Sequence, residues 1–306
     1  MNVLPRATRN GTLTVGFTLT EGAGSAPIQF SPTQPFLSIE NSVPLPMGRA
    51  YGADFFGGAS NEFYDIDPLA PTTGATVLNL ANGLNPGALW GYGDFGNNNF
   101  STFHFTRGFQ LFSSNTTTFA ETAGPTITGG PAGADAIRGL KFDRITGNWY
   151  IVWNVGALTG PASFGTIDIG TGVVTHIGAA SVVGSPLNGI IIEPVAGAIF
   201  GFDTNNATDR LISIDKVTGV GTVVGPLGTN LANFSGDGDY DDAAGTAFYS
   251  GTDNGGSGFN KWFSVNTATG ALTEIANLET ALGLGQMSAL GITTISNAAV
   301  NDWTMH

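Results

Sequence analysis

An acidic run at residues 237–242 has the residue types and spacing best suited to chemistry. It reads Asp-Gly-Asp-Tyr-Asp-Asp, with carboxylates at alternate positions and Gly245 shortly beyond them. Like charges on one face repel each other unless a cation or water separates them, and carboxylate oxygens are preferred ligands of Ca²⁺. A calcium site is therefore predicted here, with weaker candidates in two loops; the predicted ligands are Asp237, Asp239, Asp241, Asp242, Asp203, Asp209 and Asp253.

The same run also fits a purely structural interpretation. A β-strand would place alternate side chains on one face, and Asp241 would then lie in the turn that follows. The glutamate that closes an EF-hand loop is missing, because position 248 is Phe. From sequence alone, the calcium site and the structural strand stay as alternatives.

Catalytic signatures are weak in the rest of the chain. There is no Cys, and of the three His residues, His104 and His176 fall in predicted strands while His306 is the last residue. No G-x-S-x-G nucleophile elbow is present. A glycosidase needs two acids that flank a sugar, but Glu193 is the only Glu at the recurring acidic position of the repeat described below. We therefore predict no catalytic residues and no enzyme activity.

The composition limits the partners. The net charge is -13, from 23 acidic and 10 basic residues without any basic cluster, so nucleic acid and anionic membranes are excluded on electrostatic grounds. Charged residues make up only 11% of the chain, and Thr, Ser, Asn and Gly supply the polarity. We predict an extracellular or cell-surface protein, although residues 1–10 show no signal peptide, and no run is apolar enough to span a membrane.

A repeated hairpin dominates the organisation of the chain. Each copy has an alternating run, a turn that ends in Thr-Gly and a second alternating run, as expected for a β-hairpin in which Gly supplies a positive φ. An Asp or Asn begins each turn, where its side chain can accept hydrogen bonds from the following N–H groups. The three clear copies are residues 164–177, 211–224 and 262–275, and a looser copy is residues 63–78.

A second hairpin precedes each of these copies. In it, an acidic residue lies shortly before a Gly, between two strand-like runs; these acidic residues are Asp143, Glu193 and Asp241. Two hairpins make a four-stranded sheet, and a circular array of such sheets is a β-propeller. The fold class is therefore predicted to be all-β, a single β-propeller domain over residues 1–306.

The spacing of the Thr-Gly turns predicts the number of blades. Gly172, Gly219 and Gly270 are 47 and 51 residues apart, and Gly74 lies 98 residues, or two steps, before Gly172. A degenerate blade is expected at residues 87–130, and residues 12–19 resemble one more outer hairpin. Strands at 287–294 and 299–303 would complete that N-terminal blade and close the ring, which gives six blades. The alternative is five blades with residues 1–48 as N-terminal strands and a Pro-rich intersubunit arm.

The repeated [IV]-[DN]-x-x-T-G core resembles the blade signature of secreted bacterial β-propellers of the YVTN-like and PQQ-like repeat superfamily. The resemblance covers residues 137–278 best. Quinone-dependent members end the blade with Trp, whereas this chain has Ile177, Val224 and Ile275. It also lacks a vicinal Cys pair, so no quinone cofactor is expected, and Ca²⁺ is the only cofactor predicted.

These observations predict a non-catalytic extracellular structural protein that self-assembles into a surface filament or array. One alternative is an adhesion propeller that binds glycan or protein, with Trp90, Tyr92, Trp149, Trp153 and Trp262 as candidate platform residues. Another is a calcium-dependent propeller enzyme of the lactonase or lyase type. The predicted partners are further copies of the chain, with glycan as the alternative.

Overall fold

The computed structural model describes residues 48–54, 63–73, 76–78, 91–96, 100–118, 120–130, 133–157, 160–178, 186–204, 209–254 and 260–293. The chain divides into two compact units, residues 1–41 and 42–306, and every described residue belongs to the second.

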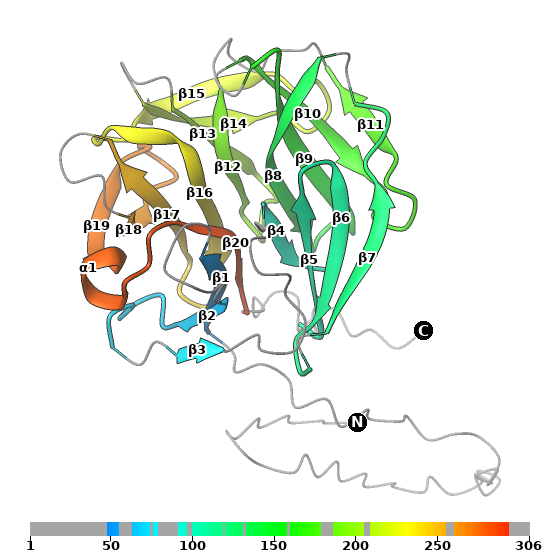
Figure 1. The fold of residues 1–306 in the computed structure, drawn as a ribbon. Coiled ribbons are helices and arrows are strands. Elements are labelled where there is room, and N and C mark those ends of the chain that lie inside the picture. Colours follow the sequence, from blue (N-terminus) through cyan, green and yellow to red (C-terminus); the bar gives the residue numbers. More distant parts are fainter. Residues whose placement is uncertain are drawn as a thin grey trace, which may run out of the picture. The chain divides into compact units, whose positions relative to one another are not determined.

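The described residues form five antiparallel sheets of four strands each (Figure 1). We name them blades 1 to 5, with the innermost strand first. Blade 1 contains β20 (Met287–Ile292), β1 (Ala50–Asp54), β2 (Phe63–Ile66) and β3 (Thr76–Leu78). Blade 2 contains β4 (Gly93–Phe95), β5 (Thr102–Arg107), β6 (Gln110–Asn115) and β7 (Glu121–Thr126).

The other three blades follow in chain order. Blade 3 contains β8 (Ala134–Asp143), β9 (Asn148–Val155), β10 (Ala162–Ile167) and β11 (Val174–Ile177). Blade 4 contains β12 (Leu187–Ile192), β13 (Ile199–Asp203), β14 (Arg210–Ile214) and β15 (Gly221–Pro226). Blade 5 contains β16 (Leu231–Asp241), β17 (Thr246–Asp253), β18 (Asn260–Val265) and β19 (Leu272–Asn277).

The inner strands close a ring. β20, β4, β8, β12 and β16 contact one another in this cyclic order, so the fold is a five-bladed β-propeller (Figure 1). Neighbouring inner strands run in the same direction, because Asp237 and Asp239 on β16 bond to the N–H groups of Leu290 and Ile292 on β20 in matching order. The carboxyl ends of all five inner strands therefore lie on one side of the ring.

The first and last described strands share blade 1; the sequence predicted closure by N- and C-terminal strands, but with residues 12–19 in the place that Ala50–Asp54 takes. β20 pairs with β1, with Ile292 opposite Ala50. Beyond this pair, the N–H of Gly48 donates to the carbonyl of Thr293 at 2.7 Å. Closing the ring in this way leaves no open end in the array of blades.

The number of blades matches the five-blade alternative, and the six-blade prediction is not confirmed. From the sequence, we assigned the hairpin at residues 63–78 to one blade and a further hairpin at residues 12–24 to a separate blade that closes the ring. In the structure β2 and β3 are the outer half of the closing blade, and β20 and β1 are its inner half. The degenerate blade expected at 87–130 is blade 2; residues 12–24 and 299–303 lie outside the described part of the chain.

The Thr-Gly turns form as predicted. The side chain that begins each turn accepts hydrogen bonds from the N–H groups two and three positions later, at 2.7 to 3.3 Å. These acceptors are Asp168, Asp215 and Asn266. The Gly that ends each turn has a φ of +68° to +85°, a left-handed conformation that other residues adopt only at a cost.

These glycines also lie against the neighbouring blade. A Cβ added to Gly172 would lie 2.3 Å from the carbonyl oxygen of Thr126, and one added to Gly219 would lie 2.4 Å from that of Ile177. At Gly270 the corresponding oxygen is that of Gly225, at 2.6 Å. The outer strands of blades 2, 3 and 4 therefore end against the Thr-Gly turns of blades 3, 4 and 5, at a separation that only Gly permits.

Apolar side chains fill the spaces between blades. One cluster joins blades 1 and 2 through Tyr51, Phe63, Phe95 and Phe103, whose rings meet edge to face or stacked. Fully burying each such ring contributes roughly 1.5 to 3 kcal/mol. The core is therefore distributed around the ring.

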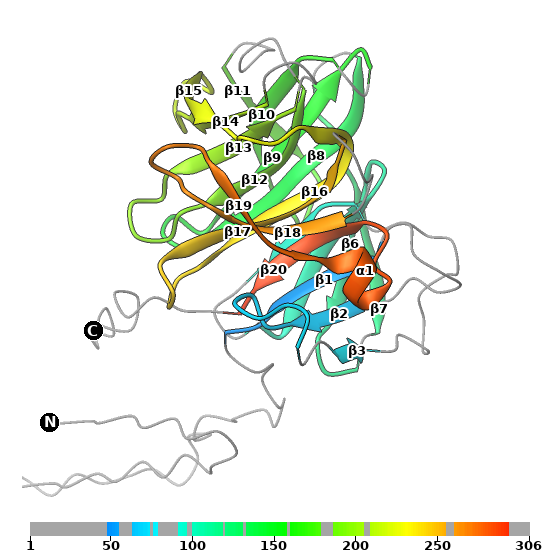
Figure 2. The same ribbon diagram turned by 90° about the vertical axis from the view of Figure 1, so that its left-hand side faces the viewer.

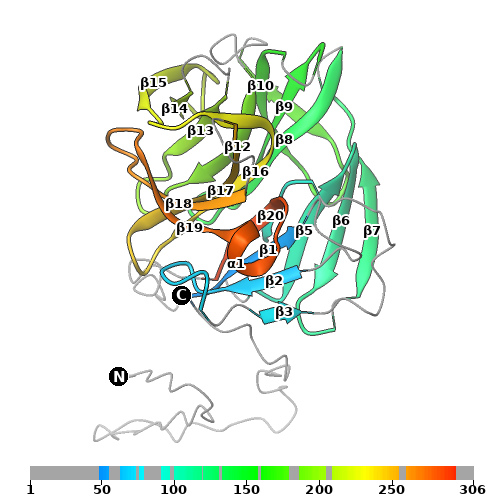
Figure 3. The same ribbon diagram turned by 60° about the vertical axis from the view of Figure 1, so that its left-hand side comes forward.

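The described chain contains one short helix, α1 (Leu278–Leu282), between β19 and β20 (Figure 2, Figure 3). The sequence predicted a short turn here. Asn277 caps its N-terminus, Gly283 ends it with a φ of +73°, and Leu278 is buried beside Met287 and Leu290. No helix within the described residues is long and apolar enough to cross a membrane.

Replacing Gly219 with Ala should destabilise the fold much more than the same change at Gly245. Both residues have similar positive φ values, +68° and +64°, but nothing lies within 4 Å of a Cβ at Gly245. We expect Gly245→Ala to cost about 1 kcal/mol for the backbone conformation alone. Gly219→Ala should cost about 2 kcal/mol more, because the new methyl group meets the Ile177 carbonyl. Urea unfolding of both variants measures the difference; equal costs would show that the contact between blades is not tight.

Candidate functional site

A cluster of charged side chains fills the centre of the ring; we call Asp94, Lys141, Asp237 and Asp239 the ring-centre cluster. Lys141 on β8 has no exposed surface, and its Nζ lies 3.0 Å from Asp237 Oδ2 on β16. It also donates to the backbone carbonyl of Gly93 on β4 at 2.8 Å, and to that of Leu290 on β20. One ammonium group therefore links the inner strands of four blades.

Two carboxylates of this cluster hold the closing strand. Asp237 Oδ2 accepts a hydrogen bond from the N–H of Leu290 at 3.0 Å, and Asp239 Oδ2 accepts one from the N–H of Ile292 at 2.6 Å. Hydrogen bonds to a charged acceptor are roughly twice as strong as those between neutral groups. β20 is thus fixed by side chains of blade 5 as well as by its backbone pairing with β1.

Asp94 on β4 makes the corresponding contact with blade 3. Its Oδ2 accepts a hydrogen bond from the N–H of Phe142 at 3.0 Å, and its Oδ1 accepts one from the N–H of Phe95 at 2.7 Å. Burial, together with the nearby charge of Asp239, raises the pKa of Asp94 to about 7, although Lys141 opposes this shift. Close to neutral pH, Asp94 is therefore poised between its protonated and charged forms.

The two members of the buried ion pair are both charged at neutral pH. Burial raises the pKa of Asp237 to about 6, while Lys141 and two backbone N–H groups favour its charged form. Burial lowers the pKa of Lys141, but the carboxylates of Asp237, Asp239 and Asp94 outweigh burial and raise that pKa above its ordinary value. The cluster thus holds one fixed cation among three acidic side chains.

Neutral groups tie the fifth inner strand to this centre. Tyr92, just before β4, donates from its hydroxyl to Asn188 Oδ1 on β12 at 2.7 Å. Asn188 Nδ2 donates to the carbonyl of Ala232 at 3.1 Å, and the hydroxyl of Tyr249 donates to the carbonyl of Asn188 at 3.0 Å. Burial raises the pKa of both tyrosines, so their hydroxyls stay protonated and remain donors.

This arrangement suits a structural task better than catalysis. A catalytic site needs titratable groups that a substrate can reach in a concave surface. Asp94, Lys141 and Asp237 have at most 2% of their surface exposed, and each uses its polar atoms to hold backbone groups or another member of the cluster. The geometry of these contacts can clamp the inner strands together.

The predicted calcium ligands of the acidic run do not converge on one point. Asp237 and Asp239 face the ring centre, whereas Asp241 ends β16 and accepts hydrogen bonds from the N–H groups of Ala243 and Ala244 in the turn that follows. Asp242 Oδ2 lies 3.5 Å from Arg144. The strand interpretation of residues 237–242 therefore describes the structure.

The other predicted ligands have partners of their own. Asp203 forms an ion pair with Arg210, and Asp253 forms one with Lys261 at 2.9 Å. Asp209 accepts a hydrogen bond from the N–H of Leu231. Among the described residues, no group of three or more His, Asp or Glu side chains is placed to hold a metal ion. Calcium binding stays a prediction.

Sequence reasoning missed Lys141 and Asp94. Lys141 stands between Leu140 and Phe142 in a strand-like run, and its partner Asp237 is 96 residues away. The available signal was the repeat itself, since Lys141 takes a position on its inner strand that Ile191 takes in blade 4. A charge at a repeat position where blade 4 has Ile191 indicates a buried partner in another blade.

The histidines and tryptophans that are described take part in packing. His104 on β5 lies 5.2 Å from the ring of Trp149, and burial lowers its pKa to about 4. Trp262 is fully buried and donates from Nε1 to the carbonyl of Pro68 at 2.9 Å. Neither tryptophan offers an open sugar platform; Trp90 and His306 lie outside the described residues.

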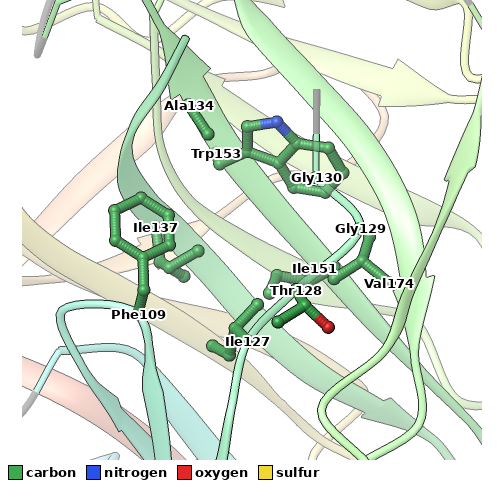
Figure 4. A pocket seen from close by; sticks show the side chains of 10 residues that line it. All are labelled: Phe109, Ile127, Thr128, Gly129, Gly130, Ala134, Ile137, Ile151, Trp153 and Val174. Atoms are coloured by element: carbon green, nitrogen blue, oxygen red, sulfur yellow. The ribbon is translucent and has the colours of Figure 1, made fainter. Parts of the chain in front are cut away.

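A small pocket of about 220 Å³ lies between blades 2 and 3 (Figure 4). Its walls carry no ionisable side chain, so it can accept an apolar group but cannot activate a substrate by acid or base chemistry. The residues that line it are Phe109, Ile127, Thr128, Gly129, Gly130, Ala134, Ile137, Ile151, Trp153 and Val174.

Comparison with known proteins defines the class as a β-propeller. No protein-family model and no curated protein sequence matches the chain. The fold is similar to that of a chain in a crystal structure of a nidogen/laminin complex, with a TM-score of 0.50 and 10% sequence identity, over 81% of this chain and 99% of that chain. This likeness shows the fold alone, and membership of the YVTN-like and PQQ-like superfamily stays a prediction.

Two further similar structures are exo-β-1,3-galactanase variants from Phanerochaete chrysosporium with β-1,3-galactotriose. Their TM-scores are 0.42 and 0.43, at 16% and 14% sequence identity. The matches cover 57% and 58% of this chain and 48% and 47% of those chains.

Replacing Lys141 with Met should destabilise the protein by about 3 to 5 kcal/mol, because it leaves the Asp237 carboxylate buried without its cation. Adding Asp237→Leu to Lys141→Met should recover part of that loss. Lys261→Met is a matched control, since Lys261 pairs with partly exposed Asp253 and Glu274 and should cost at most about 1 kcal/mol. Urea unfolding gives all three values. Equal costs for Lys141→Met and Lys261→Met would contradict the proposed role of Lys141.

Stability should fall as the pH rises from about 5 to about 8. The pKa of Asp94 is raised from 3.8 to about 7 in the folded protein, so the folded state keeps a proton that the unfolded chain has already released. Asp237, with its pKa raised to about 6, acts in the same direction. Together they should lower the free energy of unfolding by about 4 kcal/mol over this range, most of it from Asp94.

Urea titrations at the two pH values test this expectation. Asp94→Asn should remove most of the slope, whereas Asp168→Asn, a change at an exposed turn residue, should leave it intact. A stability that is constant or rises towards pH 8 would show that Asp94 is already charged in the folded state at lower pH.

Proposed function

We propose that the protein is a non-catalytic structural β-propeller that assembles with further copies of itself outside the cell. The carrying observation is a set of exposed aliphatic side chains at the same position of four hairpin turns. In each turn, the N–H two residues after the acidic side chain that begins it donates to that side chain at 2.9 to 3.0 Å. The residues at this position are Leu69, Ile145, Val195 and Val217.

The folding of a single molecule does not explain why these four turn residues are apolar. Their exposed fractions are 66%, 53%, 67% and 86%, so they add little to the core of this molecule. Turns of this kind favour Gly, Asn, Asp and Ser. The turn uses only the backbone N–H of this residue, which Gly, Asn, Asp or Ser would supply equally well. Exposed apolar residues that gather on one part of a surface mark interaction sites. This pattern supports a surface that contacts another protein.

The ring-centre cluster supports the non-catalytic part of the proposal. Lys141 and Asp237 form an ion pair at the centre of the ring. Their hydrogen bonds connect β8 and β16 with β4 and β20. A rigid ring of this kind suits a building block, because assembly then costs little conformational entropy.

The net negative charge of the chain requires that copies associate through local apolar contacts. At a net charge of -13, copies repel each other at long range, so association must depend on local apolar contacts that overcome this repulsion. The low content of charged residues, 11%, remains the reason for placing the protein outside the cell.

Electron microscopy of the full-length protein tests self-assembly. Protein would be concentrated stepwise at about 0.5 M salt, which screens the repulsion, and imaged after negative staining, with light scattering to report mass. We expect filaments or arrays whose proportion rises with concentration. A protein that stays monomeric at high concentration and high salt, with and without Ca²⁺, would refute the proposed function.

A further inference from the structure

Three of the exposed turn residues lie on adjoining turns, whose surface we call the turn face: Ile145, Val195 and Val217. Ile145 belongs to the turn after β8, and Val195 to the turn after β12. A Cβ added to Gly197, in the same turn as Val195, would lie 3.3 Å from Ile145 Cδ1 and 2.7 Å from the Nζ of Lys216, which directly precedes Val217. The turn face therefore spans blades 3 and 4.

The basic side chains beside the turn face form ion pairs within the molecule, whereas Glu193 and Asp215, which begin two of its turns, accept hydrogen bonds from groups of those turns. Lys216 Nζ forms an ion pair with Asp143 Oδ2 at 2.5 Å, and Arg144 lies 3.5 Å from Asp242. Lys216 Nζ also lies 5.4 Å from the centroid of the Tyr150 ring. The turn face thus presents apolar side chains flanked by two carboxylates, so its partner should be apolar and carry little negative charge.

Gly48, the first described residue, lies on the side of the ring that carries the turn face. The turns that carry Ile145 and Val195 follow the carboxyl ends of inner strands, which lie together on one side of the ring. In blade 1 the corresponding place is where Thr293 ends the inner strand and Gly48 enters, joined by the N–H of Gly48 and the carbonyl of Thr293 at 2.7 Å. Gly48 therefore lies on the side of the propeller that exposes the turn face, and residues 26–46 precede it closely in the sequence.

The sequence of residues 26–46 has the chemistry that such a face would bind. It reads APIQFSPTQPFLSIENSVPLP, with five Pro, several large apolar residues and a single charged residue, Glu40. Proline-rich segments favour the extended polyproline conformation, so they lose little entropy on binding to apolar surfaces. Their low charge also avoids the repulsion that the rest of this acidic chain would meet.

We propose that residues 26–46 of one copy bind the turn face of a second copy. The inference rests on the proposed self-assembly and names the surface and the segment that carry it. The two partners are different parts of the chain, so the interface is heterologous: each copy offers one arm and one turn face. Such contacts continue from copy to copy and produce open filaments unless the rotation between copies closes a ring.

Photo-crosslinking in the full-length protein tests the pairing. Phe36 would be replaced with a photo-crosslinking phenylalanine analogue in ¹⁵N-labelled protein, which is mixed with an excess of unlabelled, unsubstituted protein before irradiation. We expect crosslinks from position 36 of labelled chains to unlabelled peptides that contain Ile145, Val195 or Val217. Crosslinks only within labelled chains, or only to other surfaces, would overturn the inference.

A pair of matched double variants supplies the control. Val195→Asp with Val217→Asp in the unlabelled protein should lower the crosslink yield at least about tenfold. Val223→Asp with Ile275→Asp, which changes exposed residues of the outer strands β15 and β19, should leave it within about twofold. Far-ultraviolet circular dichroism and thermal unfolding would confirm that both variants fold. Equal yields from the two variants would also overturn the inference.

The two proposals can fail separately. If copies assemble but position 36 crosslinks elsewhere, the turn face is not the binding surface and the proposed function stands. If no assembly forms under the conditions given above, the proposed function fails and the inference fails with it.

Discussion

The buried ion pair between Lys141 and Asp237 is the interaction on which the ring depends. A closed ring brings the inner strands together where no backbone ladder joins one blade to the next, and Lys141 bridges this space from β8 to β4, β16 and β20. A buried charge must be paired and hydrogen-bonded, since an unpaired one costs several kcal/mol. The requirement to satisfy Lys141 therefore favours one arrangement of these four blades over looser ones.

Contacts at the outer edge complement this centre. The Thr-Gly turns at Gly172, Gly219 and Gly270 receive the backbone of the preceding blade at distances that leave no room for a side chain. The ring is thus fixed at its centre by charge and at its periphery by close backbone packing, with apolar clusters between. The aliphatic side chains at the turn tips are exposed and contribute to none of these contacts. We therefore assign them to association between copies.

The sequence predicted the local repeat well and the interactions between blades poorly. Asp168, Asp215 and Asn266 could be assigned to turns because each turn is built by neighbouring residues. Lys141 and Asp94 could not be assigned, because their partners are distant in sequence and their local context is that of any strand. The structure matches the five-blade alternative and not the six-blade count, because the hairpin at residues 63–78 pairs with inner strands at residues 50–54 and 287–292. The same distance in sequence hid the fact that the alternate carboxylates of β16 face a lysine, where the pattern had predicted a cation.

Native-state hydrogen exchange at the amides of Leu290 and Ile292 tests most directly whether the ring-centre cluster holds the ring closed. These amides donate to Asp237 and Asp239, so they should exchange only when the whole propeller unfolds, with the same free energy of opening as the core amide of Ile151. In Lys141→Met, all three opening free energies should fall together. Exchange at Leu290 and Ile292 through an easier local opening, unchanged by Lys141→Met, would contradict the account.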